Sequence, residues 1–143
     1  MVIDSFRGKH SFLSNFHTCN VVYENYRYPS VEHAFQCQKT FDQNERNKIL
    51  LLPDGNYTPP NICKRIARNI KLRSDWDFVK DKVMYRCLVE KFSDVHLAKL
   101  LLDTSDAQLI EGNWWGDTYW GVYKGKGKNK LAEMLMSIRG MLQ

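Results

Sequence analysis

Three polar side chains with complementary chemistry, Glu32, Gln36 and Lys39, recur at helical spacing in one short stretch of the sequence. At positions i, i+4 and i+7 they fall on one stripe of a helix about two turns long. A carboxylate, an amide and an amine on such a stripe can take a proton, hold a hydroxyl, and bind a phosphate or attack a carbonyl carbon. The same residues also suit a plain surface helix, in which the glutamate complements the helix dipole and the other two side chains are solvated.

The residues before the stripe predict where its helix begins. Pro29 disfavours helical backbone before it, and the Ser30 hydroxyl is a good N-cap for a helix over residues 31–41, with a polar second piece to about residue 51. Apolar residues on the other face should point into the core; they are Val31, Ala34, Phe35 and Phe41. Residues 20–23 and 26–28 predict a short hairpin just upstream.

A polar loop over residues 4–16 precedes the hairpin and contains Phe12 and Phe16. Ser14 and Asn15 favour local side-chain-to-backbone bonds over regular structure. The phenylalanines can pin this loop so that Arg7, Ser14 and Asn15 face a ligand. It can equally be a surface loop that aromatic side chains hold down.

Two helices in the middle of the chain come next. Residues 61–70 predict a basic helix, which is either a solvated face or a binding face and includes Arg68. A capping-box-like start at Ser74 predicts the longest helix, to about residue 92, apolar around most of its circumference and therefore central to the core. Trp76 in its first turn is either a packing residue or a stacking platform. Residues 94–103 predict a further helix.

The second informative stretch is residues 109–123, where Glu111 and Asp117 lie near a glycine-rich turn that also carries Trp120 and Gly121. Short strands are expected on either side of this turn. The glycine- and lysine-rich residues 124–130 then lead into an amphipathic helix over 131–142. Such a loop at a helix N-terminus predicts an anion cradle, with Lys128 and Asn129 among its members. The same residues are also compatible with a flexible basic turn that binds no anion.

The composition limits the classes of protein that remain. A chain of 143 residues predicts one domain, and 13% aromatic residues suit a pocket that stacks on flat rings. The net charge of +5 favours an anionic partner: a phosphate ester, a dinucleotide or nucleic acid. Four cysteines and four histidines show no metal-ligand spacing, so we expect neither a metal nor a cofactor. No apolar run resembles a signal peptide or a membrane span, so a reduced, cytoplasmic protein is expected, without a membrane partner.

Taken together, these stretches resemble the NADAR superfamily of YbiA-like proteins. The matching segments follow the family's order along nearly the whole chain; they are residues 12–16, 30–39, 75–79, 83–84, 91–92, 117–121, 127–131 and 135–139. The resemblance implies a single α+β domain over residues 1–143, mostly helical, with a few short strands supporting the loops at one end.

The resemblance also implies an activity: hydrolysis of the C1–N bond of a ribosylated compound. Family members are associated with phosphorylated ribosylamines, the early riboflavin intermediates, or with ADP-ribose on guanine in DNA, so either a phosphorylated ribosyl small molecule or an ADP-ribosylated nucleic acid is the expected substrate. The family's functional positions fall on residues of this chain; they are Glu32, Lys39, Arg68, Trp76 and Asp117. Lys39 matches a lysine proposed in some members to form a Schiff base.

The remaining candidates for substrate binding come from the stretches described above; they are Asn15, Glu111, Trp120, Gly121, Lys128 and Asn129. We expect the site where the Glu32 helix, the start of the Trp76 helix and the Asp117 turn meet. Glu32 and Asp117 would share the acid, base and charge-stabilising work, or Lys39 would attack the opened sugar. The sequence leaves both routes open.

Four positions, at three places in the chain, depart from the family pattern. Ala67 and Ala132 replace glycines, and residues 122–123 replace a more glycine-rich turn, which puts the shape of the pocket mouth in question. Two alternatives from other functional classes also remain. One is a non-catalytic module that binds ADP-ribose or a dinucleotide, and the other is a single-strand nucleic-acid binder. Acids beside a phosphate site weaken binding, which favours the enzyme over both.

Overall fold

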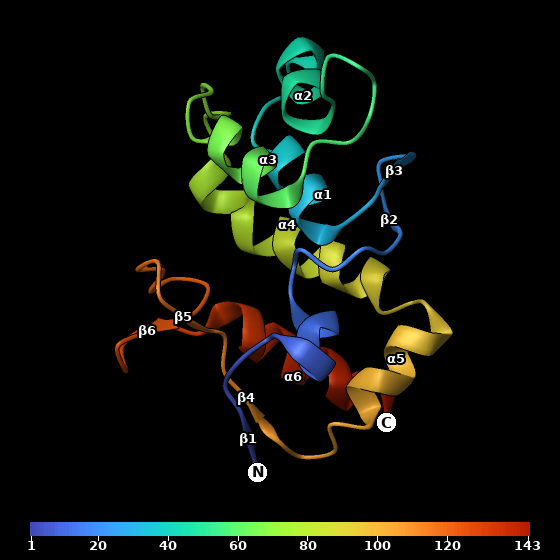
Figure 1. Cartoon of the computed structure of the whole chain (residues 1–143), viewed down its shortest axis with the longest axis vertical. Helices are drawn as coiled ribbons and strands as arrows, with labels where there is room; N and C mark the ends of the chain where they lie inside the picture. The colour runs from blue at the N-terminus through green and yellow to red at the C-terminus, as the bar shows by residue number, and fades with distance from the viewer. The chain divides into compact units, whose positions relative to one another are not determined.

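The computed structural model describes all residues, 1–143, and has an α+β fold, as predicted: six α-helices, one 3₁₀ helix and three two-stranded ladders (Figure 1). Its internal contacts gather into two compact units. We call residues 15–91 the α1 unit, and residues 1–14 with 92–143 the α6 unit. The expectation of one domain over residues 1–143 stays a prediction.

The α1 unit contains a hairpin and four helices. Its elements are β2 (Val21–Tyr23), β3 (Tyr26–Tyr28), α1 (Val31–Cys37), α2 (Gln43–Leu50), α3 (Pro60–Ala67) and α4 (Trp76–Lys91). The strands pair antiparallel, and both turn residues, Glu24 and Asn25, have positive φ (48° and 69°). Two left-handed residues give the turn a twist that matches the strands, so the predicted hairpin is confirmed.

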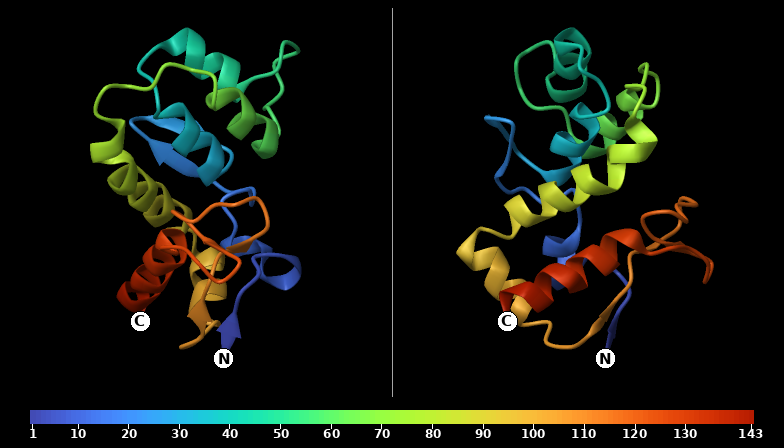
Figure 2. Two further views of the ribbon diagram at one scale, coloured as in Figure 1. Left: turned by 90° about the vertical axis from the view of Figure 1, so that its left-hand side faces the viewer. Right: turned by 180° about the vertical axis from the view of Figure 1, so that it is seen from behind.

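Helix α1 is the centre of this unit. The Ser30 hydroxyl accepts the His33 N–H, as expected of an N-cap, and every residue of α1 is buried. Helices α2, α3 and α4 and the β2–β3 hairpin all pack against it (Figure 2). The helix ends at Cys37, and Phe41, which we predicted to be in the core, is 69% exposed. The Arg73 guanidinium lies 4.1 Å from the centroid of the Phe41 ring, which gives the ring a partner outside the core.

Helix α4 is buried on one face only, so the prediction that it is central to the core was wrong. Its buried residues lie on one face; they are Trp76, Val83, Met84, Cys87, Leu88 and Lys91. Phe78 is 93% exposed, and Val89 is also exposed. These two apolar side chains do not enter the core.

The α6 unit pairs its helices with short strands. Its elements are β1 (Val2–Ile3), the 3₁₀ helix η1 (Gly8–Leu13), α5 (Val95–Leu102), β4 (Gln108–Leu109), β5 (Gly112–Asn113), β6 (Val122–Tyr123) and α6 (Lys130–Leu142). Helix α6 packs on α5 and on β4, which pairs with β1 in parallel (Figure 2). The strands expected around the glycine-rich turn exist as β5 and β6, but they also pair in parallel and so form no hairpin.

Candidate active site

The polar stripe on α1 is buried. Glu32 and Gln36 are only 5% and 4% exposed, so the alternative of solvated surface residues does not hold for them. Gln36 Nε2 donates to Glu32 Oε1 at 2.7 Å, which fixes the orientation of both side chains. Gln36 Oε1 is buried without a hydrogen-bond partner. A buried acceptor of this kind is costly unless a ligand or an ordered water donates to it, so Gln36 Oε1 is a candidate for contact with a ligand.

Asn15 lies at the start of the same helix. Its carbonyl accepts the Glu32 N–H at 3.0 Å, and its Nδ2 lies 3.6 Å from Met84 Sδ on α4. Asn15 Oδ1, like Gln36 Oε1, is buried without a hydrogen-bond partner. Asn15 therefore lies beside the Glu32 end of α1, and its predicted ligand-facing role stays a prediction.

Lys39 lies two residues beyond the end of α1 and is partly buried. Burial lowers the pKa of its amine below the ordinary 10.5, the Glu32 carboxylate opposes this shift, and the Lys64 and Arg68 cations add to it. Desolvation and nearby positive charge both disfavour the ammonium form. A larger share of Lys39 is therefore a neutral amine near pH 7, the form that attacks carbonyl and iminium carbons.

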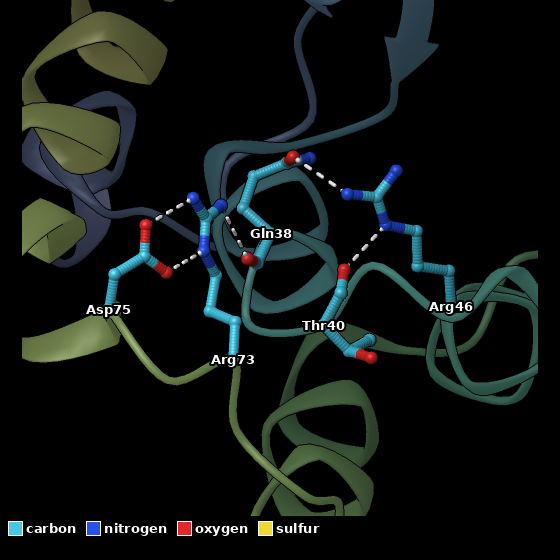
Figure 3. A network of polar contacts seen from close by, with 5 residues as sticks. All are labelled: Gln38, Thr40, Arg46, Arg73 and Asp75. Carbon is cyan, nitrogen blue, oxygen red and sulfur yellow. Dashed lines mark hydrogen bonds and ion pairs between the residues drawn. The ribbon is translucent and has the colours of Figure 1, made fainter.

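Two arginines hold the backbone that carries Lys39 (Figure 3). Arg46 Nε donates to the carbonyls of Cys37 (3.0 Å) and Thr40 (2.8 Å), and its Nη2 donates to Gln38 Oε1 (3.3 Å). The Lys39 carbonyl accepts the Arg73 backbone N–H at 2.8 Å.

The Arg73 side chain completes this arrangement. Its Nη1 donates to the Gln38 carbonyl at 3.4 Å, and its Nε and Nη2 pair with both Asp75 carboxylate oxygens at 2.6 and 2.9 Å. All four carbonyls of residues 37–40 therefore have an arginine donor. Positive charge at a helix C-terminus also complements the dipole, so these arginines both end α1 and fix the position of Lys39.

Trp76 and Arg68 flank the stripe from two other helices. The Trp76 ring packs on Phe35 with centroids 5.1 Å apart, and Trp76 is 6% exposed, so it is a packing residue that borders α1. Arg68 is the exposed C-cap residue of α3, and its charge acts on Lys39. An exposed cation near a partly buried amine can bind the phosphate of a ligand.

In the α6 unit, Asp117 organises the turn that carries the aromatic residues. Its Oδ1 accepts the backbone N–H groups of Tyr119 and Trp120, both at 3.0 Å. Asn113 supports the same turn, because its Oδ1 accepts the Asp117 N–H and its Nδ2 donates to the Asp117 carbonyl. The carboxylate of Asp117 is therefore rigidly placed beside Trp120.

The predicted anion cradle at the start of α6 was wrong. The backbone N–H groups of residues 128–131 donate to the carbonyls of residues 118–121, so they are not available to an anion. The loop that holds Trp120 and Gly121 takes the place of the expected ligand. Only side-chain charge remains there, with the ammonium groups of Lys128 and Lys130 near the Tyr119 ring (5.2 and 5.1 Å).

Asn129 positions its neighbours. Its Oδ1 accepts the Glu111 N–H and its Nδ2 donates to the Leu109 carbonyl, both at 3.0 Å, so contact with a substrate would require one of these bonds to break. Gly121 has no room for a side chain, because a Cβ there would collide with the Glu111 carbonyl. These residues fix the backbone around Glu111.

The predicted site residues fall into two groups. The α1 unit contains Asn15, Glu32, Lys39, Arg68 and Trp76, and the α6 unit contains Glu111, Asp117, Trp120, Gly121, Lys128 and Asn129. That both groups form one site stays a prediction. Lys64 and the two arginines that hold residues 37–40 were not predicted, because only tertiary structure relates them to Lys39. No group of three or more His, Cys, Asp or Glu side chains is arranged to hold a metal, and no helix is long and apolar enough to span a membrane.

Comparison with known proteins gives one consistent result. The family model of the NADAR domain matches residues 4–143. The chain is 37% identical to an N-glycosidase YbiA from Shigella boydii over 133 residues, which are 90% of this chain and 79% of that protein. It is 34% identical to a riboflavin biosynthesis protein from Vibrio vulnificus over 138 residues, which are 94% of this chain and 36% of that protein. The NMR structure of Escherichia coli YbiA superposes with a TM-score of 0.81 at 34% identity, over 99% of this chain and 84% of that one.

Proposed function

The chain belongs to the NADAR family, and from that premise we propose that it is an N-glycosidase that hydrolyses the C1–N bond of a phosphorylated ribosyl compound. The names of the similar proteins support this reaction class, since they include N-glycosidases and a riboflavin biosynthesis protein. A ribosylamine phosphate and an ADP-ribosylated base both contain the bond, and the ribosylamine phosphate is the smaller and simpler substrate to test.

The observation that carries the proposal is the state of Lys39. Its amine is partly buried, its pKa is lowered by burial and by Lys64 and Arg68, and it lies in the field of the buried Glu32 carboxylate. A surface lysine would be almost wholly protonated and a poor nucleophile. Of the two routes that the sequence leaves open, this environment supports attack by Lys39.

In the proposed mechanism, the ribosylamine ring opens to an iminium with its double bond between C1 and the amine nitrogen. The neutral Lys39 amine attacks C1, and the bond from C1 to the leaving nitrogen then breaks as that nitrogen takes up a proton. The product is a Schiff base between Lys39 and the sugar. Water adds to C1, the Lys39 nitrogen leaves, and the ribose phosphate is released with the lysine regenerated. No oxidant or reductant is consumed.

We assign the proton transfers to Glu32, whose charge acts on Lys39. A carboxyl group near the amine can donate a proton to the leaving nitrogen and then take one from the attacking water. Gln36 holds Glu32 through the 2.7 Å bond, and its unpaired Oε1 is an acceptor for a sugar hydroxyl. Asn15 Oδ1 offers a second acceptor at the start of the helix.

The remaining predicted residues have supporting roles in this proposal. Lys64 and Arg68 provide the positive charge for the substrate phosphate. Both cations act on the pKa of Lys39, so they lie within electrostatic range of its amine. Asp117, held on a rigid turn beside Trp120, lies in the α6 unit with Trp120, and the part of these two residues in the reaction stays a prediction.

The test is a product assay with a purified ribosylamine phosphate. We expect wild-type protein to release the free amine and ribose phosphate, measured by liquid chromatography. Lys39→Gln should lower kcat by on the order of a thousandfold, and Lys48→Gln, which removes an exposed lysine on α2, should leave the rate unchanged. Release at the uncatalysed rate by wild-type protein, with both ribosylamine phosphate and ADP-ribosylated guanine in DNA as substrates, would contradict the proposed function.

A further inference from the structure

The α6 unit contains a cleft that the proposed reaction does not use. It has a volume of about 500 Å³ and is bounded by the segment after β1 and by residues of β5, β6 and the turns that follow them. Asp4, Arg7, Trp114 and Lys124 line it. The two walls are in close backbone contact, because a Cβ at Gly112 would collide with the Asp4 carbonyl. Of the residues predicted to face a ligand, only Arg7 lines this cleft, and the proposed reaction assigns it no role.

Trp114 is the largest apolar group in the cleft and is 73% exposed. It follows Asn113, whose side chain bonds to the backbone of Asp117 at both of its atoms and also donates to the Val122 carbonyl at 3.2 Å. The Trp114 ring also meets Trp115 edge to face, with centroids 5.6 Å apart. The indole is thus exposed on a well-held turn, so stacking a flat ring on it would order little additional chain.

Arg7 and Lys124 are the cations of the cleft, and neither forms an ion pair. Lys124 is held at the tip of a tight turn in which the backbones of Tyr123 and Lys126 exchange both hydrogen bonds, at 2.8 and 3.0 Å. Its φ of 49° is unfavourable for a residue with a side chain. Lys126 and Lys128 are exposed further along the same loop, so the positive charge continues beyond the cleft.

We propose that this cleft binds single-stranded nucleic acid, with a base stacked on Trp114 and backbone phosphates paired with Arg7 and Lys124. An aromatic platform beside cations is the combination by which single strands are bound without sequence preference, and the Lys124 ammonium, which forms no ion pair, lies 5.2 Å from the centroid of the Tyr123 ring. The cleft is open to solvent, and its cations continue along the loop, which suits a strand that passes through better than an enclosed mononucleotide. Asp4, the one acid that lines the cleft, opposes phosphate binding by its charge but can accept a hydrogen bond from a base N–H group, such as N3–H of thymine.

The test is fluorescence anisotropy with a labelled oligothymidine of about twelve nucleotides, within the usual site size for single strands. Trp114→Ala should weaken binding about tenfold, which is the loss expected for one stacked base. Arg7→Gln with Lys124→Gln should lower the slope of log K against log salt by about 1.4, or about 0.7 for each phosphate that is no longer neutralised. Lys99→Gln, which removes an exposed charge on α5, is the matched control and should change binding little.

Other outcomes would overturn the proposal. Equal affinities of wild type and Trp114→Ala, or an equal loss in Lys99→Gln and Lys124→Gln, would show that only net charge matters. If adenosine monophosphate competed as well as the oligonucleotide, the ligand of the cleft would be a single nucleotide and not a strand. Binding is measured without turnover, and Trp114→Ala should keep wild-type activity on a ribosylamine phosphate, so failure here and failure of the proposed reaction are distinct results.

Discussion

Replacing Arg46 by methionine should destabilise the protein and impair the placement of Lys39. The guanidinium makes three hydrogen bonds, two of which share Nε (to Cys37 and Thr40) while the third runs from Nη2 to Gln38. A hydrogen bond from a charged donor contributes about 1.5–3 kcal/mol. Because two of the three hydrogen bonds share one N–H, together they contribute about as much as two. Arg46 is only partly buried, so water recovers part of the loss. We therefore expect the free energy of unfolding to fall by about 2–4 kcal/mol.

The assay is urea denaturation followed by circular dichroism, with Arg46→Lys as the matched control. Lysine keeps the positive charge but cannot donate to several acceptors from a planar fork, so an intermediate loss is expected. A fall of about 2–4 kcal/mol also corresponds to a drop in melting temperature of roughly 5–15 °C for a chain of this size. If Arg46→Met unfolds at the same urea concentration as wild type with the same m-value, the role assigned to Arg46 is refuted.

Other consequences can be measured on the same protein. Glu32→Gln should lower kcat on the order of a hundredfold or more while the melting curve is kept, and an undiminished rate would remove Glu32 from the mechanism. Asp117→Asn keeps the Oδ1 acceptor of its turn and should change the shape of the pH–rate profile, and an unchanged profile would leave Asp117 a turn residue only. Because the pKa of Lys39 is lowered, kcat/KM should rise with pH and level off below 10.5, and a rise that continues to 10.5 would argue against the neutral amine as nucleophile. Burial lowers the pKa of Lys91 to about 8, so the native state binds fewer protons than the unfolded state between about pH 8 and 10.5. The free energy of unfolding of wild type, relative to that of Lys91→Met, should therefore rise with pH across that window in urea titrations. A difference that does not change with pH would contradict this.

Local sequence signals were enough to predict the elements that begin with a clear cap or turn. Ser30 predicted the start of α1, and Glu24 with Asn25 predicted the hairpin, because one residue type at one position determines each feature. The end of α1 could not be predicted in this way. No glycine or proline follows Cys37, and the helix ends where Arg46 and Arg73, from later segments, take its carbonyls. Phe41 was assigned to the core because the predicted helix continued to residue 41.

The α6 unit shows a second limit. The glycine- and lysine-rich residues 124–130 predicted free N–H groups at the start of α6, but the carbonyls of residues 118–121 occupy them. The parallel pairing of β5 and β6 likewise depends on the path of the chain between the two strands, and the alternation of residues within each strand does not determine that path. The residue types of the α1 stripe did predict a candidate site, whereas the burial of Glu32 and the lowered pKa of Lys39 required the packed structure.

The most direct measurement of the central claim is chemical trapping on Lys39. Sodium borohydride added during turnover of a ribosylamine phosphate reduces a Schiff base to a stable amine. Mass spectrometry of the digested protein should then find the reduced ribose phosphate on the peptide that contains Lys39, and Lys39→Arg should give neither adduct nor product. An unmodified Lys39 under conditions of turnover, with Lys39→Arg still active, would contradict the account.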